Sequence, residues 1–250
     1  MSVDDQFTKS LLHFDGVDAS TTFLDESGKA WTRYGDAQIS TAQKKFGASS
    51  ALFDGNGDYI STPSHADFDL STGDFTVDCW FRFSQTPNAS ATEMCQRIIA
   101  NGIVTSMQGA WCLGVYSDTI NFAYYIGAVY NRNSSAISVS ANVWYHLALV
   151  RASGTVYFYL NGVPKGSGVC LDRLVTTEST MIGTRAGTSI EYFPGNIDEL
   201  RFSKGIARWT SDFSSNLPTS FSTFFLTLLR PFFSALSTFK STLKGDKPCQ

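Results

Sequence analysis

Charged residues are scarce in this chain, and their scarcity narrows the classes of protein to which it can belong. Of its 250 residues, 16% are charged, against about 25% in ordinary globular domains. The 19 basic and 22 acidic residues give a formal charge of −3. The composition therefore excludes a charge-driven disordered chain and a basic protein that coats nucleic acid, and we expect no nucleic-acid partner.

Paired cysteines and a secretory leader are also missing. The five cysteines occur singly, without a C-x-x-C pair, which argues against a zinc ribbon or a thioredoxin-type site. Residues 1–10 contain two acids and no apolar run, so we expect no signal peptide. An odd number of cysteines without a leader favours free thiols. Cys79 alternates with apolar residues and is expected to be a packed thiol.

Enzyme signatures are absent as well. The sequence contains no G-x-S-x-G, P-loop, H-E-x-x-H or G-x-G-x-x-G motif, and its three histidines lie far apart. A sandwich glycosidase needs two carboxylates on one face, beside the glycosidic bond. Asp198 and Glu199 are neighbours that should point to opposite faces of a strand. Asp67 and Asp69 fall in a turn-like stretch. The sequence therefore predicts a protein that is not an enzyme.

Small polar and aromatic residues take the place of the missing charges. The chain has 31 Ser, 24 Thr and 20 Gly, and 14% of its residues are aromatic. Short alternating segments recur between turn residues, and the clearest is Phe75–Phe83. Tyr145–Arg151 and Thr155–Leu160 are joined by Ser153-Gly154 and followed by Asn161-Gly162. These turn signals predict a β-meander.

About a dozen strands are expected in all, enough for two packed antiparallel sheets in an all-β fold. The remaining predicted strands are Ser10–Phe14, Ala30–Tyr34, Ala48–Phe53, Asp58–Thr62, Arg97–Ala100, Trp111–Tyr116, Thr119–Ile126, Thr180–Gly183 and Gly195–Ser203. Short helical turns are predicted at Ser64–Leu70 and Lys204–Trp209.

The composition changes after Pro218, where six of the 20 phenylalanines lie between Phe221 and Phe239. On a helical projection the apolar residues share one face and the Ser and Thr residues the other. The sequence thus predicts a sandwich domain over 1–218 and an amphipathic helix over 219–250, kinked at Pro231.

This predicted helix is not expected to insert across a membrane, because Arg230 and the Ser/Thr stripe oppose burial in lipid. The segment is basic, and we expect it to dock to a partner or to copies of itself. Two other interpretations stay open: it packs on its own sandwich, or it is a frame-shifted or fused end.

Six segments, in this order, resemble the laminin-G-like, concanavalin A-like jelly-roll domain. The resemblance covers about residues 8–218 and implies a two-sheet jelly roll that binds glycans. The opening and closing segments look most like versions found in tailed bacteriophage and environmental viral proteins. The six are Leu11–Gly16 (LLHFDG), Ala51–Pro63 (ALFDGNGDYISTP), Phe75–Phe83 (FTVDCWFRF), Trp144–Arg151 (WYHLALVR), Leu160–Val163 (LNGV) and Gly195–Phe213 (GNIDELRFSKGIARWTSDF).

The resemblance also implies a structural Ca²⁺ site, because members of this family often hold one calcium ion. The matching positions are Asp198, near the start of the last strand, and Asp54-Gly55 in the F-D-G turn. Asp198 alternates with Leu200 and Phe202, so it should face inward and need a partner. The alternative is that Asp198 caps backbone amides without a metal. Asp15 and Asp58 are weaker candidates that could be turn acids.

For ligand binding, the even face of the Phe75–Phe83 strand offers Asp78, Trp80 and Arg82. An aromatic plane flanked by charge suits a sugar ring. The alternative is that Trp80 is buried beneath loops. The same face could include Trp111, Tyr124, Tyr125, Tyr130, Tyr157 and Tyr159.

Two function hypotheses follow. The first is a non-enzymatic virion accessory protein, such as a capsid-decorating, tail or fibre component. It would be made in the host cytoplasm, would be located in the virion and would assemble through its C-terminal segment into a homo-oligomer or with other virion structural proteins. The second is a carbohydrate-binding module that recognises host or environmental polysaccharide.

Overall fold

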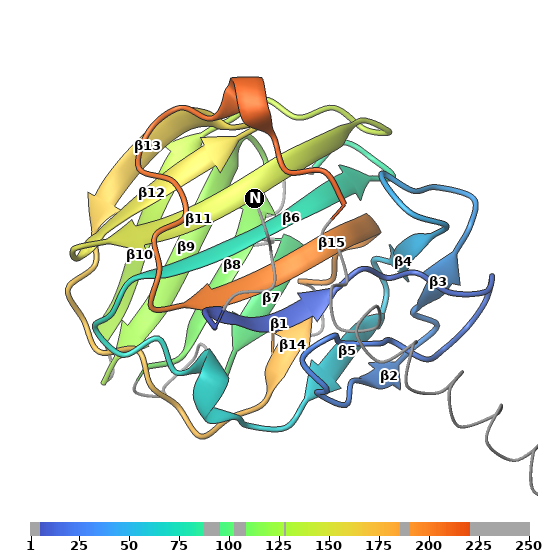
Figure 1. Ribbon diagram of the computed structural model, residues 1–250, viewed down its shortest axis with the longest axis horizontal. Helices are drawn as coiled ribbons and strands as arrows, with labels where there is room; N and C mark the ends of the chain where they lie inside the picture. Colours follow the sequence, from blue (N-terminus) through green and yellow to red (C-terminus); the bar gives the residue numbers. More distant parts are fainter. Residues whose placement is uncertain (1–5, 88–95, 103–108, 128, 186–190, 221–250) are drawn as a thin grey trace, which may run out of the picture.

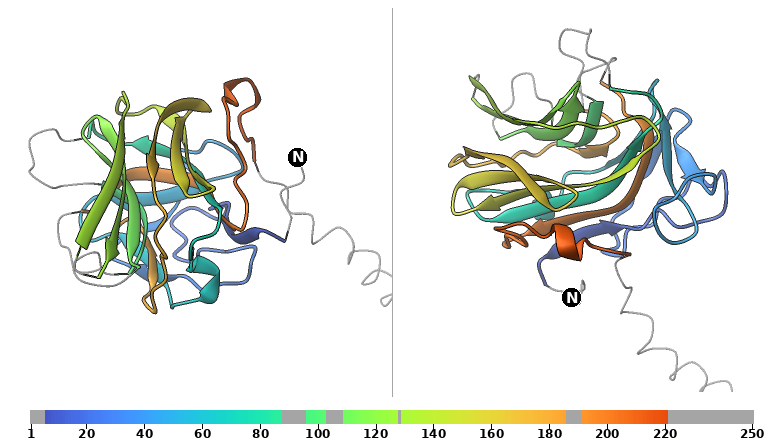
Figure 2. Two further views of the ribbon diagram at one scale, coloured as in Figure 1. Left: turned by 90° about the vertical axis from the view of Figure 1, so that its left-hand side faces the viewer. Right: turned by 90° about the horizontal axis from the view of Figure 1, so that it is seen from above.

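The computed structural model describes residues 6–87, 96–102, 109–127, 129–185 and 191–220, which fold into two antiparallel β-sheets packed face to face (Figure 1). Figure 2 shows the two layers from the side and from above. The all-β sandwich expected from the sequence is therefore confirmed. Residues 221–250 lie outside the described residues, and with them nearly all of the helix predicted over 219–250.

The eight-stranded sheet lies in front in Figure 1 and has the order β13-β12-β11-β6-β15-β4-β3, with β1 also pairing with β15. Its strands are β1 Thr8–Leu12, β3 Gln38–Ser40, β4 Ser50–Asp54, β6 Phe75–Phe83, β11 Trp144–Ala152, β12 Thr155–Leu160, β13 Val163–Val169 and β15 Pro194–Lys204.

The seven-stranded sheet lies behind it with the order β10-β9-β8-β7-β14-β5-β2. Its strands are β2 Thr32–Tyr34, β5 Tyr59–Thr62, β7 Gln96–Asn101, β8 Trp111–Tyr116, β9 Thr119–Ile126, β10 Val129–Ala136 and β14 Thr180–Ile182. Two short 3₁₀ turns, Ala66–Phe68 and Ser214–Asn216, complete the described elements. Among the residues that the structure describes, no helix is long and apolar enough to cross a membrane.

The core lies between the sheets and is rich in aromatic rings. The odd positions of β6, from Phe75 to Phe83, all point into it and are almost fully buried. Cys79 is among them as a free buried thiol, as the alternation predicted. Trp111 and Phe122 contribute to the core from the seven-stranded sheet. This dense apolar layer provides the main stabilisation of the fold.

The predicted meander is also confirmed. The turn Ser153-Gly154 joins β11 to β12, and Asn161-Gly162 joins β12 to β13. All four residues have positive φ, between 49° and 79°. This is the conformation of the tight turns whose twist matches that of a hairpin.

Four sequence expectations differ from the observed elements. Strands β3, β10 and β13 were not predicted, because β3 has three residues, β10 is rich in Asn and Ser, and β13 contains Pro164 and two glycines. The predicted helical turn at Lys204–Trp209 is wrong, whereas the turn predicted within Ser64–Leu70 is present as Ala66–Phe68.

A β-bulge in β15 corrects the expected orientation of Asp198. In the pairing with β6, Asp198 lies opposite Trp80 and Arg201 lies opposite Asp78. Two residues therefore separate Asp198 from Arg201 where one separates their partners, and Glu199 has a φ of 49°. Because of this extra residue, Asp198 faces outward with Arg201 and not inward with Phe202.

Candidate functional site

The outer face of the eight-stranded sheet holds the residues that the sequence suggested for ligand binding. Asp78 accepts two hydrogen bonds of 2.9 Å from the Arg201 guanidinium and lies 3.4 Å from Nε2 of His146. Burial alone would raise the pKa of Asp78, but Arg201 and His146 outweigh it and hold the pKa below its ordinary value. Asp78 is 1% exposed, so this network is internal.

Trp80 is buried too, with 4% of its surface exposed. Its indole nitrogen donates to the Pro218 carbonyl at 3.3 Å, and the Lys45 ammonium lies 4.2 Å from the ring centre. The indole thus contacts residues of its own chain through both its nitrogen and its ring. This arrangement matches the alternative in which Trp80 lies beneath other segments.

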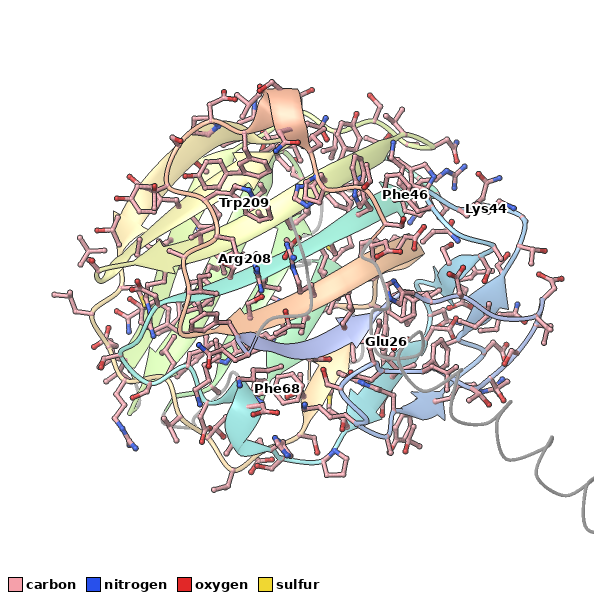
Figure 3. The ribbon with its side chains drawn as sticks, in the orientation of Figure 1. Glu26, Lys44, Phe46, Phe68, Arg208 and Trp209 are labelled. Atoms are coloured by element: carbon pink, nitrogen blue, oxygen red, sulfur yellow. The ribbon has the colours of Figure 1, made fainter. Side chains whose placement is uncertain are left out.

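Residues 205–218 form the cover of this face. They cross in front of β15, β6 and β11, and Figure 3 labels Arg208 and Trp209 on them. Trp209 stacks on Phe213 at 4.2 Å, and both pack with the outward residues Ala148 and Val150 of β11. The face on which Asp78 and Trp80 lie is therefore filled by the chain itself.

Arg82 ends the predicted set and is half-buried. Its Nη2 donates to Oδ1 of Asn142 at 2.5 Å, and its Nη1 donates to Oδ1 of Asn196 at 3.4 Å. The three residues share a face, as predicted, but they do not form an exposed aromatic platform.

The residues expected to hold Ca²⁺ are not brought together. Asp54 lies opposite Pro194, four residues along β15 from Asp198, which corresponds to about 13 Å. Oδ1 of Asp54 accepts from the Asn56 amide at 2.6 Å. Within the described part of the chain no group of three acidic, histidine or cysteine residues could hold a metal. Calcium binding stays a prediction that Asp54, Gly55 and Asp198 do not support.

Asp198 caps a loop instead. Its Oδ2 accepts hydrogen bonds of 2.7 Å from the Lys45 amide and 3.0 Å from the Phe46 amide. The weaker candidates act in the same way, since Asp15 accepts from the Ala48 amide and Asp58 from the Asp54 amide. These acids match the alternative interpretation of turn and loop carboxylates.

Burial raises the pKa of Asp198 to about 7, although the two amides oppose the shift. Its neighbour Glu199 points elsewhere and pairs with Nδ1 of His13 at 3.0 Å. Burial would lower the pKa of His13, but the hydrogen bond and charge of Glu199 raise it overall. Asp67 pairs with Lys29 at 2.8 Å. These carboxylates, the candidates for acid–base work, therefore belong to separate local networks.

The outer face of the seven-stranded sheet carries a different set of side chains. Tyr34 on β2 and Tyr59 on β5 are paired in register and stack with ring centres 4.3 Å apart and planes 2° apart. Tyr192 stacks on Tyr59 at 6.5 Å. We call these three residues the tyrosine ladder. Tyr34 is 43% exposed, and the other two are half-buried.

Next to the ladder lies an arginine cluster formed by Arg97, Arg185 and Glu191. Glu191 accepts from Nε of Arg97 at 2.7 Å, and Nη2 of Arg185 donates to it at 3.0 Å. Burial opposes ionisation, but the two arginines dominate and lower the pKa of Glu191. Because Glu191 precedes Tyr192 in the chain, the cluster and the ladder adjoin one another.

The pairing register extends this cluster across the sheet. Arg97 lies opposite Gly114, Gly114 opposite Asn121, and Asn121 opposite Ser134. We call these four the transverse row. Beside it, Ala100, Cys112 and Ala123 make a strip of small side chains that is separate from the main core. The row therefore runs across strands β7 to β10 on the outer face.

Two buried polar atoms near this row have no hydrogen-bond partner among the described residues: Oδ1 of Asn121 and Nη1 of Arg185. Asn121 is 2% exposed, and its amide nitrogen donates to Thr119. One atom is an acceptor and the other a donor. Such groups cost free energy when left unpaired, so each calls for a partner.

The other aromatic residues suggested from the sequence fall in three places. Trp111 and Tyr124 are in the core. Tyr159 lies on the outer face of the eight-stranded sheet, packed with Phe213, and Tyr157 packs with the same group. Tyr125 and Tyr130 lie on the seven-stranded sheet, 5.3 Å apart between ring centres.

Neither the ladder nor the cluster was predicted from the sequence. Tyr34 and Tyr59 were expected on strands, but 25 residues separate them, and nothing local indicates that β2 pairs with β5. Arg97 and Glu191 are 94 residues apart. The available signal was the alternation within each strand, which gives a face to each residue but no neighbour from another strand.

Comparisons with known proteins agree with this architecture. The search of curated proteins found no match. Domain 4 of AbnA, an extracellular arabinanase of family GH43 from Geobacillus stearothermophilus solved with arabinotriose, matches with a TM-score of 0.62 and 20% identity. The match covers 80% of this chain and 94% of that domain.

Toxin binding domains are similar as well. The binding domain of botulinum neurotoxin serotype D matches with a TM-score of 0.60 and 17% identity over 80% of this chain. The binding domain of Paraclostridial Mosquitocidal Protein 1 matches with a TM-score of 0.61 and 14% identity, over the same share. The chain spans 49% of each of these two domains.

The narrower resemblance to viral proteins stays a prediction, since these matches are to an arabinanase and to toxins. The wider resemblance is shown by the sequence itself. The family model Laminin_G_3 matches residues 54–208, which run from the end of β4 to the segment after β15. The chain therefore belongs to the concanavalin A-like lectin/glucanases superfamily.

Proposed function

We propose that this protein is a carbohydrate-binding module whose glycan site is the outer face of the seven-stranded sheet. The observation that carries the proposal is the adjacency of the tyrosine ladder to buried polar atoms that have no partner in the described chain. Sugars need both features, because their C–H faces pack on aromatic rings and their hydroxyls form hydrogen bonds.

The aromatic part of the proposed site is rigid before any ligand arrives. Tyr34 and Tyr59 are stacked within 2° and anchored on paired strands. Tyrosine loses little side-chain entropy on binding, and an ordered ring loses less still. A preformed ladder with one half-exposed ring is therefore suited to pack against a sugar.

The polar part offers a donor and an acceptor. Nη1 of Arg185 can donate to a sugar oxygen, and Oδ1 of Asn121 can accept from a hydroxyl. Arg97 and Asn121 are two strands apart in the transverse row, about 10 Å. That separation is comparable to two linked sugar rings. Arg97 and Asn121 are 6% and 2% exposed, so the accessible part of the proposed site is the tyrosine ladder.

The comparisons support a binding role over a catalytic one. The arabinanase domain that is similar over 94% of its length was solved with arabinotriose. One toxin binding domain, that of botulinum neurotoxin DC, was solved with a sialylated ligand, but this chain spans 49% of it. The arabinanase domain is accordingly the better guide. We expect no hydrolysis, because the carboxylates discussed above are engaged in separate networks.

The test is retention of the full chain on a panel of immobilised polysaccharides by affinity electrophoresis. We expect retention on at least one polysaccharide, and a loss of about tenfold in affinity for Tyr59→Ala. Tyr157→Ala, a tyrosine on the other sheet, is the matched control and should retain binding. Equal losses in both variants, or no retention on any glycan, would remove the proposal.

The virion accessory role remains a separate hypothesis, with location in the virion and assembly through residues 219–250. Its support is the composition of that segment, whose apolar stripe needs a cover. Light scattering on the full chain should give a defined oligomer, and Phe224→Ser with Phe225→Ser should reduce its molar mass. A monomeric full chain at micromolar concentration would count against this role.

A further inference from the structure

We propose that the glycan bound at this face is anionic and that Arg185 receives its carboxylate. The inference rests on the proposed function and names the substrate class of the same site. It concerns an acidic polysaccharide, such as one built from uronic acids. Three observations support it. The face carries a positive charge, both carboxylate oxygens of Glu191 already accept hydrogen bonds from arginine, and Nη1 of Arg185 has no hydrogen-bond partner among the described residues.

The face is positive in a protein that is negative overall. At the outward positions of the seven described strands the charged residues are Arg97 and Arg132, and Arg97 pairs with Glu191. Arg185 and Glu191 add one charge of each sign beside them. The sum is +2, against a formal charge of −3 for the chain. Such a local field favours an anionic partner.

Glu191 does not cancel the donor capacity of Arg185. Both of its carboxylate oxygens accept from Arg185, through Nε and Nη2, and one of them also accepts from Arg97. It thereby acts as a positioning residue that fixes the plane of the Arg185 guanidinium. The remaining nitrogen, Nη1, is buried and has no partner in the described chain.

A guanidinium held in this way is suited to a carboxylate. Its planar donors match the two oxygens of that group, and a charge-assisted hydrogen bond is about twice as strong as a neutral one. Side-chain exposure at Arg185 is 15%, so the bond would form away from bulk water, where screening is weak. A neutral sugar hydroxyl would form a weaker hydrogen bond with the same nitrogen, because it carries no charge.

The two probes are polygalacturonate and its carboxyl-reduced form, which keeps the backbone and linkage but has no charge. Affinity electrophoresis of the full chain should show at least fivefold stronger retention on the acidic polymer. We expect Arg185→Gln to abolish this preference, with a large loss of retention on the acidic polymer and a smaller loss on the reduced polymer, which also uses this donor. Lys165→Gln removes the same charge on exposed β13 of the other sheet and is the control.

Each result decides between the two proposals. Equal retention on both polymers overturns the anionic preference and leaves carbohydrate binding intact. Equal losses for Arg185→Gln and Lys165→Gln show a diffuse charge effect and also overturn it. No retention on these polymers, or on the neutral panel above, removes the proposed function itself. If Arg185→Gln fails to fold, Arg132→Gln on the edge strand β10 tests the same charge, with at least a twofold loss of preference expected.

Discussion

The outer faces of the two sheets carry the same kinds of residue and use them differently. On the eight-stranded sheet, Asp78, Trp80 and Arg201 lie beneath residues 205–218 and bond to their own chain. On the seven-stranded sheet, the tyrosine ladder and the arginine cluster leave Tyr34 exposed and two polar atoms unpaired. Aromatic rings beside charges therefore do not by themselves make a binding site.

The two faces differ in what covers them. Trp209 and Phe213 pack against the apolar outer surface of β11. The Pro218 carbonyl accepts the hydrogen bond of the Trp80 indole nitrogen. Groups that have such partners within the chain contribute to stability. Substitutions on the covered face should accordingly change stability, and substitutions on the other face should change binding.

Breaking the buried ion pair of the covered face should have the largest effect. Arg201→Met leaves Asp78 charged and buried without its main partner, which we expect to cost about 3–5 kcal/mol of unfolding free energy. Chemical denaturation measures the change. The double variant Asp78→Asn with Arg201→Met should recover much of the loss, because no lone charge remains. A single variant as stable as the parent would mean that the pair is not internal.

Replacing one aromatic residue on each face should separate the effect on stability from the effect on glycan retention. Trp80→Ala creates a cavity under residues 205–218 and should cost about 3 kcal/mol, with glycan retention unchanged. Tyr59→Ala should cost about 1 kcal/mol, because the ring is half-buried, and should lose about tenfold in retention. Thermal unfolding and affinity electrophoresis on the same samples measure both. If Trp80→Ala lost retention while remaining folded, the assignment of faces would be reversed.

The stability of the folded domain should depend on pH through Asp198, which lies on the covered face. Its pKa is about 7 in the folded chain against an ordinary 3.8, so between these values the folded state holds a proton that the unfolded state has released. Stability should then fall as the pH rises from about 4 to about 7. The raised pKa of His13 acts in the same direction, with its contribution lost as the pH rises through the folded pKa.

The matched variant is Asp198→Asn, which is neutral at every pH. We expect it to be on the order of 1–4 kcal/mol more stable than the parent at pH 8, with a flatter dependence on pH between 5 and 8. The unfolding midpoint measured across that range gives the answer. A parent curve that does not fall between pH 5 and 8 would contradict the raised pKa.

The smallest change in stability is expected at the F-D-G turn, where the family resemblance placed a calcium ligand. Asp54 is exposed and bonds to the Asn56 amide, so Asp54→Asn should cost about 0.5 kcal/mol or less. A chelator should leave the unfolding midpoint of the parent unchanged. A rise in stability with added Ca²⁺ that Asp54→Asn removes would restore the calcium site.

Local patterns were sufficient for the strands that face the core. Alternation predicted β6 and its inward residues, including Cys79, because burial on one face imposes a period of two. The turn signals Ser153-Gly154 and Asn161-Gly162 placed β11 and β12, because few residues tolerate positive φ. Edge strands such as β13 were missed, because exposed positions place little constraint on residue type.

The orientation of Asp198 could not be predicted, because the bulge at Glu199 adds one residue to β15 and shifts the alternation. The candidate site could not be predicted from the sequence for a related reason. Tyr34, Tyr59 and Tyr192 meet through strand pairing and loop return, and no local pattern encodes those contacts. The family resemblance likewise pointed to Asp54, Gly55 and Asp198, which the folded chain keeps apart.

The all-β sandwich follows from the sequence alone, because alternation and turn residues act over a few neighbouring positions, and the superfamily follows from the match of residues 54–208 to its family model. The fold in three dimensions sets which outer face residues 205–218 cover and which face leaves Tyr34 exposed. That choice depends on where residues 205–218 lie and on how β2, β5, β7 and β9 are ordered. Both are contacts between distant segments, and their energies arise once the two sheets have packed.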